Sequence, residues 1–291
     1  MSRDQTTPYS VSVEGDRTLQ AIVGAVLSSL PRTYSRLEGA VRAPVDVVAV
    51  AGGGEWADAA VQAIDAGVRG VIVIEPSPVA LPGVDRLAEK AGAQRAVVRL
   101  ARRWAGDPAV VPFSRARAVG GGTTLVDSRI ELPGGVRPGP AAVAQIDLVQ
   151  TALKGTVEIE SAVFLEDSYV ATGRLVRGAH SDLLLLSGAS SMPFRHRASV
   201  RELLLEGRRS LAIGDGETAR AAVASVGDRE GTRILPPVYE TGYRAAWRAL
   251  AADLDESRAS GAAGGAPPLS DLAEYRHALT AAQPILENTA R

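Results

Sequence analysis

Short apolar runs alternate with amphipathic stretches over the first third of the chain, and this alternation constrains the fold more than any other feature. Residues 45–50 (VDVVAV) and 71–74 (VIVI) are continuous apolar runs, which are typical of parallel strands buried on both faces. Between them Trp56, Ala60 and Ile64 recur at i, i+4 and i+8, the spacing of one helix face. Strands and helices in this order predict a parallel sheet with helices on both faces.

The same alternation extends to both sides of this segment. The pattern predicts strands at 11–13 and 95–100 and helices at 18–30, 33–41 and 84–91. The first strand and helix form a βα unit at the start of the chain, because apolar residues line one stripe of the helix. We therefore expect the parallel sheet to occupy a first domain, residues 1–112.

Beyond Pro112 the period of the pattern changes from helical to alternating. Period-two segments predict strands at 124–132, 157–165, 169–175 and 182–186, with one helix at 141–153 among them. The chain then returns to helix. We expect a second, α+β domain over residues 113–291, consisting of an open-faced sheet and C-terminal helices.

Composition excludes several classes of function. The formal net charge is −1, from 32 basic and 33 acidic residues, so no positive field attracts nucleic acid or an anionic membrane. The absence of cysteine excludes disulfides and thiolate ligands, and the chain has only three histidines, so we expect no metal site. The N-terminus is polar and no apolar run reaches about 18 residues. We therefore expect a cytoplasmic protein.

Residues 45–110 resemble the Gfo/Idh/MocA family of NAD(P)-dependent oxidoreductases. The resemblance lies in the order and spacing of five short motifs, which here read Ala51–Gly54, Asp65–Gly67, Ile74–Pro76, Ala88–Gly92 and Trp104–Pro108. It implies a Rossmann-like domain followed by an open-faced sheet domain, with a sugar or cyclitol held between them. It also implies hydride transfer between a carbinol carbon and a nicotinamide, although a fold alone does not establish an activity.

The cofactor positions depart from the usual pattern. A dinucleotide site needs several glycines after the first strand, so that the pyrophosphate can approach a helix N-terminus, whereas residues 15–20 read GDRTLQ. Asp16 puts a carboxylate where a phosphate would bind, which is repulsive unless Arg17 offsets it. The positions that the resemblance places near a cofactor are Gly15, Gly52, Gly53, Gly54, Glu75 and Pro76. The glycine run at 52–54 is also explained by a flexible strand-to-helix turn.

The usual second strand of a dinucleotide-binding domain also lacks a candidate segment. Only residues 31–44 separate the helix at 18–30 from the strand at 45–50, and they contain no apolar run. That strand carries the acidic residue that binds the ribose in such domains. We therefore expect the second strand and its helix to be missing.

The catalytic positions implied by the resemblance are largely replaced. Glu75 stands where the family has the lysine that acts near the reacting carbon, which inverts the local charge. On the helix of the second domain the family's Asp-x-x-x-His-x-x-Asp pattern aligns with Pro140, Ala144 and Asp147. Only its last acidic residue is retained. For Asp147 a solvated or capping role is the simpler interpretation, and for Glu75 a site role and a plain surface role are both open.

These departures lead to two hypotheses about function. The first is a member of this fold that has lost catalysis, binds no cofactor, and acts as a partner subunit or ligand-binding protein in a sugar-related pathway. The alternative is an active NAD(P)-dependent oxidoreductase or lyase on a sugar or nucleotide sugar, with an altered site that uses Glu75 and Asp147. In either case we expect a homo- or hetero-oligomer paired through the second-domain sheet, and a small sugar-like ligand.

Overall fold

The chain forms two compact units that interrupt each other in sequence. The computed structural model describes residues 8–37, 45–116, 122–136, 138–192, 196–214, 221–260 and 270–289. One unit comprises Met1–Arg102 and Tyr243–Ala273, and the other comprises Arg103–Gly242 and Glu274–Arg291. This division corrects the expected one at residue 112, because a late helix returns to complete the core of the first unit.

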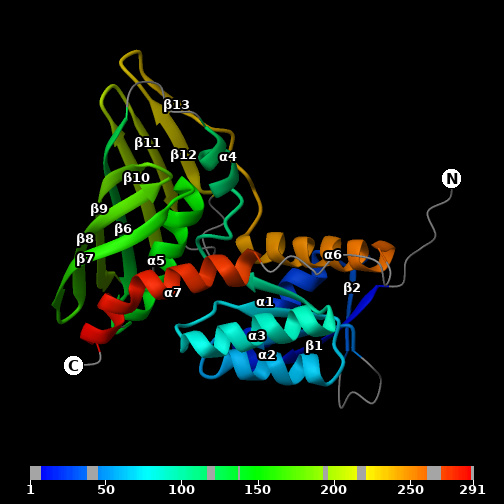
Figure 1. Cartoon of the computed structure of the whole chain (residues 1–291). Helices are drawn as coiled ribbons and strands as arrows, with labels where there is room; N and C mark the ends of the chain where they lie inside the picture. Colours follow the sequence, from blue (N-terminus) through cyan, green and yellow to red (C-terminus); the bar gives the residue numbers. More distant parts are fainter. Residues whose placement is uncertain are drawn as a thin grey trace. The chain divides into compact units, whose positions relative to one another are not determined.

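The first unit contains a five-stranded parallel sheet with the order β2-β1-β3-β4-β5. Its central strands are buried throughout, as the apolar runs predict. The strands are β1 (Tyr9–Glu14), β2 (Tyr34–Arg36), β3 (Val47–Ala51), β4 (Gly70–Ile74) and β5 (Val97–Ala101). The helices are α1 (Arg17–Ser28), α2 (Trp56–Asp65), α3 (Leu81–Gln94) and α6 (Gly242–Ser260), with α2 and α3 side by side (Figure 1).

The second strand is present, which corrects the expectation that it is missing. Tyr34–Arg36 pairs in parallel with the start of β1, in the segment where we predicted a helix over 33–41. Three residues are too few to show a period, so the pairing with β1 and the burial of Tyr34 determine the strand. Residues 38–44, where the rest of that helix was expected, lie outside the described residues.

Helices α1 and α6 share one apolar core with the sheet. Leu19 and Val23 of α1 and Trp247 and Leu250 of α6 are buried in one cluster with the strands. The Tyr34 hydroxyl donates to the backbone carbonyl of Trp247 at 2.7 Å. A buried hydrogen bond therefore links the edge strand β2 to α6, in addition to apolar packing.

An ion cluster attaches the late helices to the opposite edge strand. Arg99 of β5 donates through Nε to Asp253 of α6 at 2.6 Å and through Nη1 to Asp271 at 3.2 Å. Asp271 lies in the first turn of α7 (Ser270–Thr289) and also accepts from the Leu100 amide. Because these carboxylates are largely shielded from water, the pairs hold α6 and the start of α7 in register with β5.

The second unit contains an eight-stranded mixed sheet with the order β13-β12-β11-β10-β6-β9-β8-β7. Helix α5 (Pro138–Leu153) packs on one face of it (Figure 1). The β6 and β9 strands are parallel and the other neighbours are antiparallel. The strands are β6 (Thr123–Pro133), β7 (Thr156–Leu165), β8 (Ser168–Arg177), β9 (His180–Met192), β10 (Arg197–Leu204), β11 (Arg208–Ile213), β12 (Val223–Gly227) and β13 (Thr232–Ile234). A short helix, α4 (Val110–Arg115), precedes them.

Side chains of this second sheet alternate between a covered and an exposed face. Along β8 and β11, for example, every second residue is buried, as a sheet covered on one side requires. The exposed face carries several large apolar side chains, including Val163, Leu165, Val170, Leu183 and Leu203. The predicted fold class, a Rossmann-like parallel sheet with a second α+β sheet domain, is confirmed. None of the described helices is long and apolar enough to cross a membrane.

Candidate functional site

The carboxyl ends of the parallel strands gather the sequence-predicted cofactor positions at one edge of the first sheet. Gly15 follows β1, Gly52 follows β3, and Glu75 follows β4. Since all five strands run in the same direction, these three turns lie at the same edge. In open α/β sheets ligands bind outside this edge, so it is the candidate site of the first unit.

The turn after β1 is capped by the protein's own carboxylate. Asp16 is the N-cap of α1, and its Oδ1 accepts from the Leu19 amide at 2.9 Å. That amide is one of the groups that a bound phosphate would otherwise use. The amides of Arg17 and Thr18 have no acceptor in the helix, since the first bond within it joins the Gln20 amide to the Asp16 carbonyl.

Arg17 supplies the charge that would offset Asp16. Its side chain is exposed, and it has no hydrogen bond or ion pair to any residue that the structure describes. An anion at this turn can therefore meet two free amides and one guanidinium, against one carboxylate. The turn fits a phosphate group in this altered form, and not in the form that several glycines provide.

The turn after β3 packs directly against the turn after β4. The Gly52 amide donates to the Ile74 carbonyl at 2.8 Å, and the Ser77 amide donates to the Gly52 carbonyl at 2.7 Å. A Cβ on Gly52 would lie 2.1 Å from the Glu75 carbonyl oxygen, so only glycine fits. Gly53 and Gly54 would meet nothing within 4 Å. Close backbone packing explains Gly52, and Gly53 and Gly54 leave open space beside the edge.

Glu75 has a strained backbone at the end of β4. Its φ is +54°, in the left-handed region that costs a residue with a Cβ roughly 1–2 kcal/mol. A residue before proline is ordinarily extended, and Pro76 follows, so the conformation is unusual for two reasons. Bonds on both sides hold it, since the Glu75 amide donates to the Ala101 carbonyl at 3.0 Å and the Trp56 indole to the Ser77 carbonyl at 2.9 Å. Strain of this kind is concentrated at functional sites.

Asp147 belongs to the other unit, and it is buried. It lies on α5 with 2% of its surface exposed, which corrects the expectation of a solvated or capping role. Almost every side of α5 is covered, including the positions of Gln145 and Asp147. Burial and then the negative charge of Asp147 raise the pKa of the Tyr275 hydroxyl on α7. Sequence analysis did not single out Tyr275, which is buried at 2% exposure near Asp147. Ala144 is half-buried on the same helix.

A buried hydrogen-bond network lies between α5 and the sheet. Gln145 donates to the Ser128 hydroxyl at 3.1 Å and to the Ser187 carbonyl at 3.2 Å, and it accepts from the Tyr169 hydroxyl. The Ser128 hydroxyl in turn donates to the Ser199 carbonyl at 3.0 Å. Every side-chain polar group of this network has a partner. The network therefore holds α5 on the sheet without the free-energy cost of a buried polar group that lacks a hydrogen bond.

A second buried cluster surrounds Glu202 on the covered face. Glu202 is 1% exposed, and it accepts from Thr123 at 2.7 Å, from Arg177 at 2.8 Å and from Arg209. Arg177 also pairs with Asp182. Burial alone would raise the pKa of Glu202, but Thr123, Arg209 and Arg177 together hold it below its usual range. The cluster is charge-balanced and links five strands, β6, β8, β9, β10 and β11.

Within the described parts of the chain, no group of three or more histidine, aspartate or glutamate side chains could hold a metal ion. Among the described residues, the candidate groups are carboxylates, arginines and backbone amides at the edge of the first sheet, and Asp147 in the second unit.

Comparison with known proteins supports the fold. The sequence matches no protein-family model and no curated protein sequence. Among solved structures, it is similar to a lysine-to-glutamate mutant of KijD10, a 3-ketoreductase from Actinomadura kijaniata in complex with TDP-benzene and NADP. The TM-score is 0.74 and the identity 16%, over 95% of this chain and 96% of that one.

Two further neighbours have similar statistics. GenD2 from gentamicin A biosynthesis, in complex with NAD, has a TM-score of 0.68 and 15% identity over 100% of this chain and 96% of that one. UDP-N-acetylglucosamine 3-dehydrogenase GnnA from Acidithiobacillus ferrooxidans has a TM-score of 0.69 and 14% identity, over 95% of this chain and 96% of that one. These neighbours are Gfo/Idh/MocA-type oxidoreductases, so the resemblance in the sequence is confirmed at the level of the fold.

Proposed function

We propose that this chain is an NAD(P)-dependent oxidoreductase that acts on a sugar or nucleotide sugar through an altered site, which is the alternative of the two hypotheses. The observation that carries the proposal is Glu75, whose strained backbone is held at the ligand-binding edge of the first sheet. Two further observations support it. The second strand is present, and the turn at Arg17 retains free amides and a guanidinium for a phosphate.

The neighbours give the proposal its substrate class. KijD10 is a 3-ketoreductase seen with NADP and TDP-benzene, GenD2 is seen with NAD, and GnnA is a dehydrogenase of a nucleotide sugar. The KijD10 mutant that has glutamate in place of a lysine is still in complex with NADP. That lysine-to-glutamate change therefore leaves NADP bound in that protein.

Each residue then has a defined role in the reaction. Arg17 and the amides of Arg17 and Thr18 would hold the pyrophosphate, and Gly53 and Gly54 leave room beside it. When bound, NAD(P) accepts or donates a hydride at a carbinol carbon. The Glu75 carboxylate would accept the proton of the substrate hydroxyl as the carbonyl forms. A carboxylate in place of a lysine would take this proton as a general base, and its protonated form would return the proton when the carbonyl is reduced.

A titration with NAD(H) and NADP(H), followed by the fluorescence of the reduced nicotinamide and by calorimetry, tests the proposal. We expect saturable binding tighter than about 100 μM, which corresponds to roughly 5.5 kcal/mol. Arg17→Gln should weaken that binding about tenfold through the loss of a charge-assisted contact. Arg32→Gln, in the turn after α1, is the matched control and should bind as the wild type does.

The role of Glu75 needs a readout separate from binding. In a screen of sugars and nucleotide sugars with NAD(P), Glu75→Gln should lower the turnover at least about 100-fold while cofactor binding stays unchanged. Equal turnover in wild type and Glu75→Gln would contradict the role of the carboxylate. Failure to bind any cofactor at millimolar concentration would reject the whole proposal.

The second candidate function is a non-catalytic partner subunit or sugar-binding protein. Asp16, which already occupies one amide at the start of α1, and Ala144, in place of a histidine, favour it. A protein of this kind would be stabilised by sugars alone, in proportion to RT ln(1 + [L]/Kd). A rise in melting temperature with sugars and none with NAD(P) would support this candidate over the first.

We also propose that the chain forms a homo- or hetero-oligomer through the exposed face of the second sheet. The apolar side chains on that face, including Leu183 at 58% and Val163 at 62% exposure, support an interface. Leu183→Glu should shift the mass in sedimentation equilibrium towards the monomer. Tyr239→Glu, an exposed position outside the sheet, should leave the mass unchanged.

A further inference from the structure

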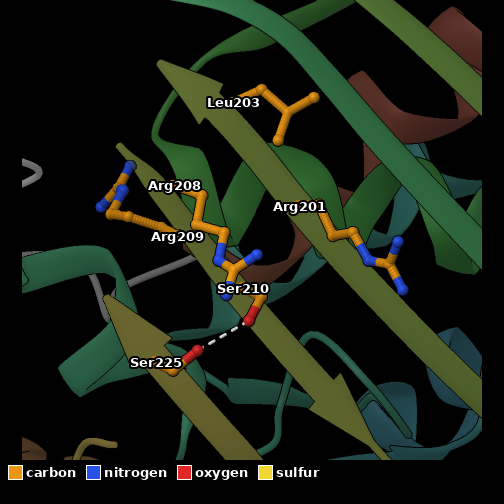
Figure 2. Close-up of a pocket in the computed structure, with 6 residues that line it drawn as sticks. All are labelled: Arg201, Leu203, Arg208, Arg209, Ser210 and Ser225. Carbon is orange, nitrogen blue, oxygen red and sulfur yellow. Dashed lines mark hydrogen bonds between the residues drawn. The ribbon is translucent and has the colours of Figure 1, made fainter. Parts of the chain in front are cut away.

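An arginine-lined hollow lies on the exposed face of the second sheet, far in sequence from the candidate site. It spans strands β10, β11 and β12 and has an empty volume of about 680 Å³, part of it open to solvent. Its lining residues are Arg201, Leu203, Arg208, Arg209, Ser210 and Ser225 (Figure 2). It lies at the β10–β12 end of the sheet, whereas Leu183 and Val163, which support the oligomer interface, lie on β9 and β7 towards the other end. Neither the fold nor the proposed oxidoreductase activity accounts for the hollow.

The strand register places these side chains on one face. Arg201 pairs with Ser210, Ser210 pairs with Ser225, and Leu203 pairs with Arg208. Arg201 and Arg208 are therefore diagonal neighbours on adjacent antiparallel strands, within reach of each other's long side chains. Arg209 borders the hollow, but its guanidinium is on the covered face and bound to Glu202.

The two exposed arginines are not neutralised. Arg201 has no hydrogen bond or ion pair to any described residue, although it lies opposite Asp127 in the register. Asp127 pairs instead with Arg129 at 3.3 Å. To the residues that the structure describes, Arg208 has one hydrogen bond, a long one of 3.4 Å to the Thr232 hydroxyl. The nearby Glu206 is paired with Arg229.

The floor of the hollow adds hydroxyl groups. Ser210 Oγ and Ser225 Oγ are 2.8 Å apart in a hydrogen bond, which uses the proton of only one of them. The other hydroxyl keeps its proton free to donate. Two guanidinium groups and a free O–H form a donor set that matches an oxyanion with several acceptor oxygens, and arginine suits phosphate in particular.

We propose that this hollow binds the phosphate group of a small anionic ligand. The guanidinium groups of Arg201 and Arg208 donate to its oxygens, a serine hydroxyl donates from the floor, and Leu203 contacts the organic part of a phosphate ester. All the residues of this site belong to the second unit.

Calorimetric titration at constant ionic strength in a chloride buffer tests the proposal with two probes, inorganic phosphate and glucose 1-phosphate, and with glucose as the neutral control. We expect a dissociation constant on the order of 1 mM or tighter for at least one phosphate, and none for glucose. Binding of both probes indicates recognition of the phosphate alone, whereas binding of the ester only indicates recognition of the organic part as well. Absence of binding by both probes overturns the proposal.

Variants identify the residues involved. Arg201→Gln and Arg208→Gln should each weaken phosphate binding about tenfold or more, since each removes a charge-assisted hydrogen bond. Arg174→Gln is the matched control, because Arg174 is exposed on the same face and already paired with Glu160 at 2.7 Å. Equal affinity in all three variants overturns the assignment.

A second measurement uses the wild-type protein. Phenylglyoxal modifies accessible arginines, and mass spectrometry reports the extent at each position. Phosphate should protect Arg201 and Arg208 and leave Arg174 unprotected. Equal modification of all three arginines in the presence and absence of phosphate contradicts the site. Protection that depends on protein concentration and not on phosphate also contradicts it, because it indicates that a second copy covers the hollow.

Discussion

The two sheets of this chain bury their strands in different ways. In the first unit β3 and β4 are buried on both faces and carry only apolar residues and glycine, and the shielded ion cluster lies at the edge strand β5. In the second unit charged and amide side chains are buried on the covered side of the sheet, among them Glu202 and Arg209 of the strands and Gln145 of α5. The stability of the first sheet therefore depends mainly on close apolar packing, and that of the second also depends on buried hydrogen bonds and ion pairs. The two sheets should respond to different perturbations.

The largest effect is expected at Glu202. Replacement by glutamine leaves Arg209 with an uncompensated buried charge, because Arg177 keeps Asp182 as a partner. The loss costs about 3–5 kcal/mol of unfolding free energy. Glu160→Gln removes one partner of an exposed pair and should cost under about 1 kcal/mol. Urea unfolding of both variants measures the difference. Equal losses would mean that the Glu202 cluster is no more important than a surface ion pair.

A smaller effect is expected at Gly52, where the first unit depends on shape. The Cβ of alanine would lie 2.1 Å from the Glu75 carbonyl oxygen, so the two turns must separate, at a cost of about 1–3 kcal/mol. Gly53→Ala meets nothing within 4 Å and should change stability by under about 0.5 kcal/mol. Thermal unfolding checks both. A neutral Gly52→Ala variant would show that the turns are not closely packed.

The smallest effect is expected in the dependence of stability on pH. Because the folded pKa of Glu202 is below its unfolded value of 4.5, its contribution is complete above that value and is lost as pH falls through the folded pKa. Burial raises the pKa of Asp253 in the first unit, despite the opposing charge of Arg99. That group therefore favours the folded state most below its unfolded pKa, and this preference declines as pH rises.

Hydrogen exchange followed by mass spectrometry separates the two contributions, because its peptides report each unit by itself. On acidification from about pH 6 to about pH 3, protection should decrease first in the second unit. Glu202→Gln should remove most of that acid dependence. Earlier loss of protection in the first unit would contradict the assignment of opposite signs.

Sequence patterns predicted the first sheet better than the second, because its central strands are buried on both faces. The runs at 45–50 and 71–74 correspond to β3 and β4 within two residues, because burial on both faces leaves a continuous apolar signal. The β2 strand was missed, since it has three residues and its pairing with β1 determines it. No local pattern indicated that α6 belongs to the core of the first unit.

The candidate site was predictable only in part. The resemblance indicated Glu75 and the glycines, which lie together at one edge of the first sheet. The left-handed backbone of Glu75 and the packing of Gly52 against it arise from contacts between two turns, which no local pattern encodes. The residues of the Glu202 cluster are far apart in sequence, and only the strand order of the second sheet brings them together. They are Thr123, Arg177, Asp182, Glu202 and Arg209. The sequence predicted a solvated or capping role for Asp147, because the elements that cover α5 on almost every side could not be inferred from local patterns.

The return of α6 to the first unit has a consequence for the order in which the chain can fold during synthesis. Trp247, Leu250 and Leu254 complete the core beneath β1 and β3, yet they are translated after nearly all of the second unit. The nascent first unit therefore exposes an apolar surface for as long as the ribosome takes to make about 140 further residues, at roughly 5–20 residues per second. A fragment ending at residue 112 would stay in that exposed condition permanently, and it would be a substrate for chaperones and not a domain.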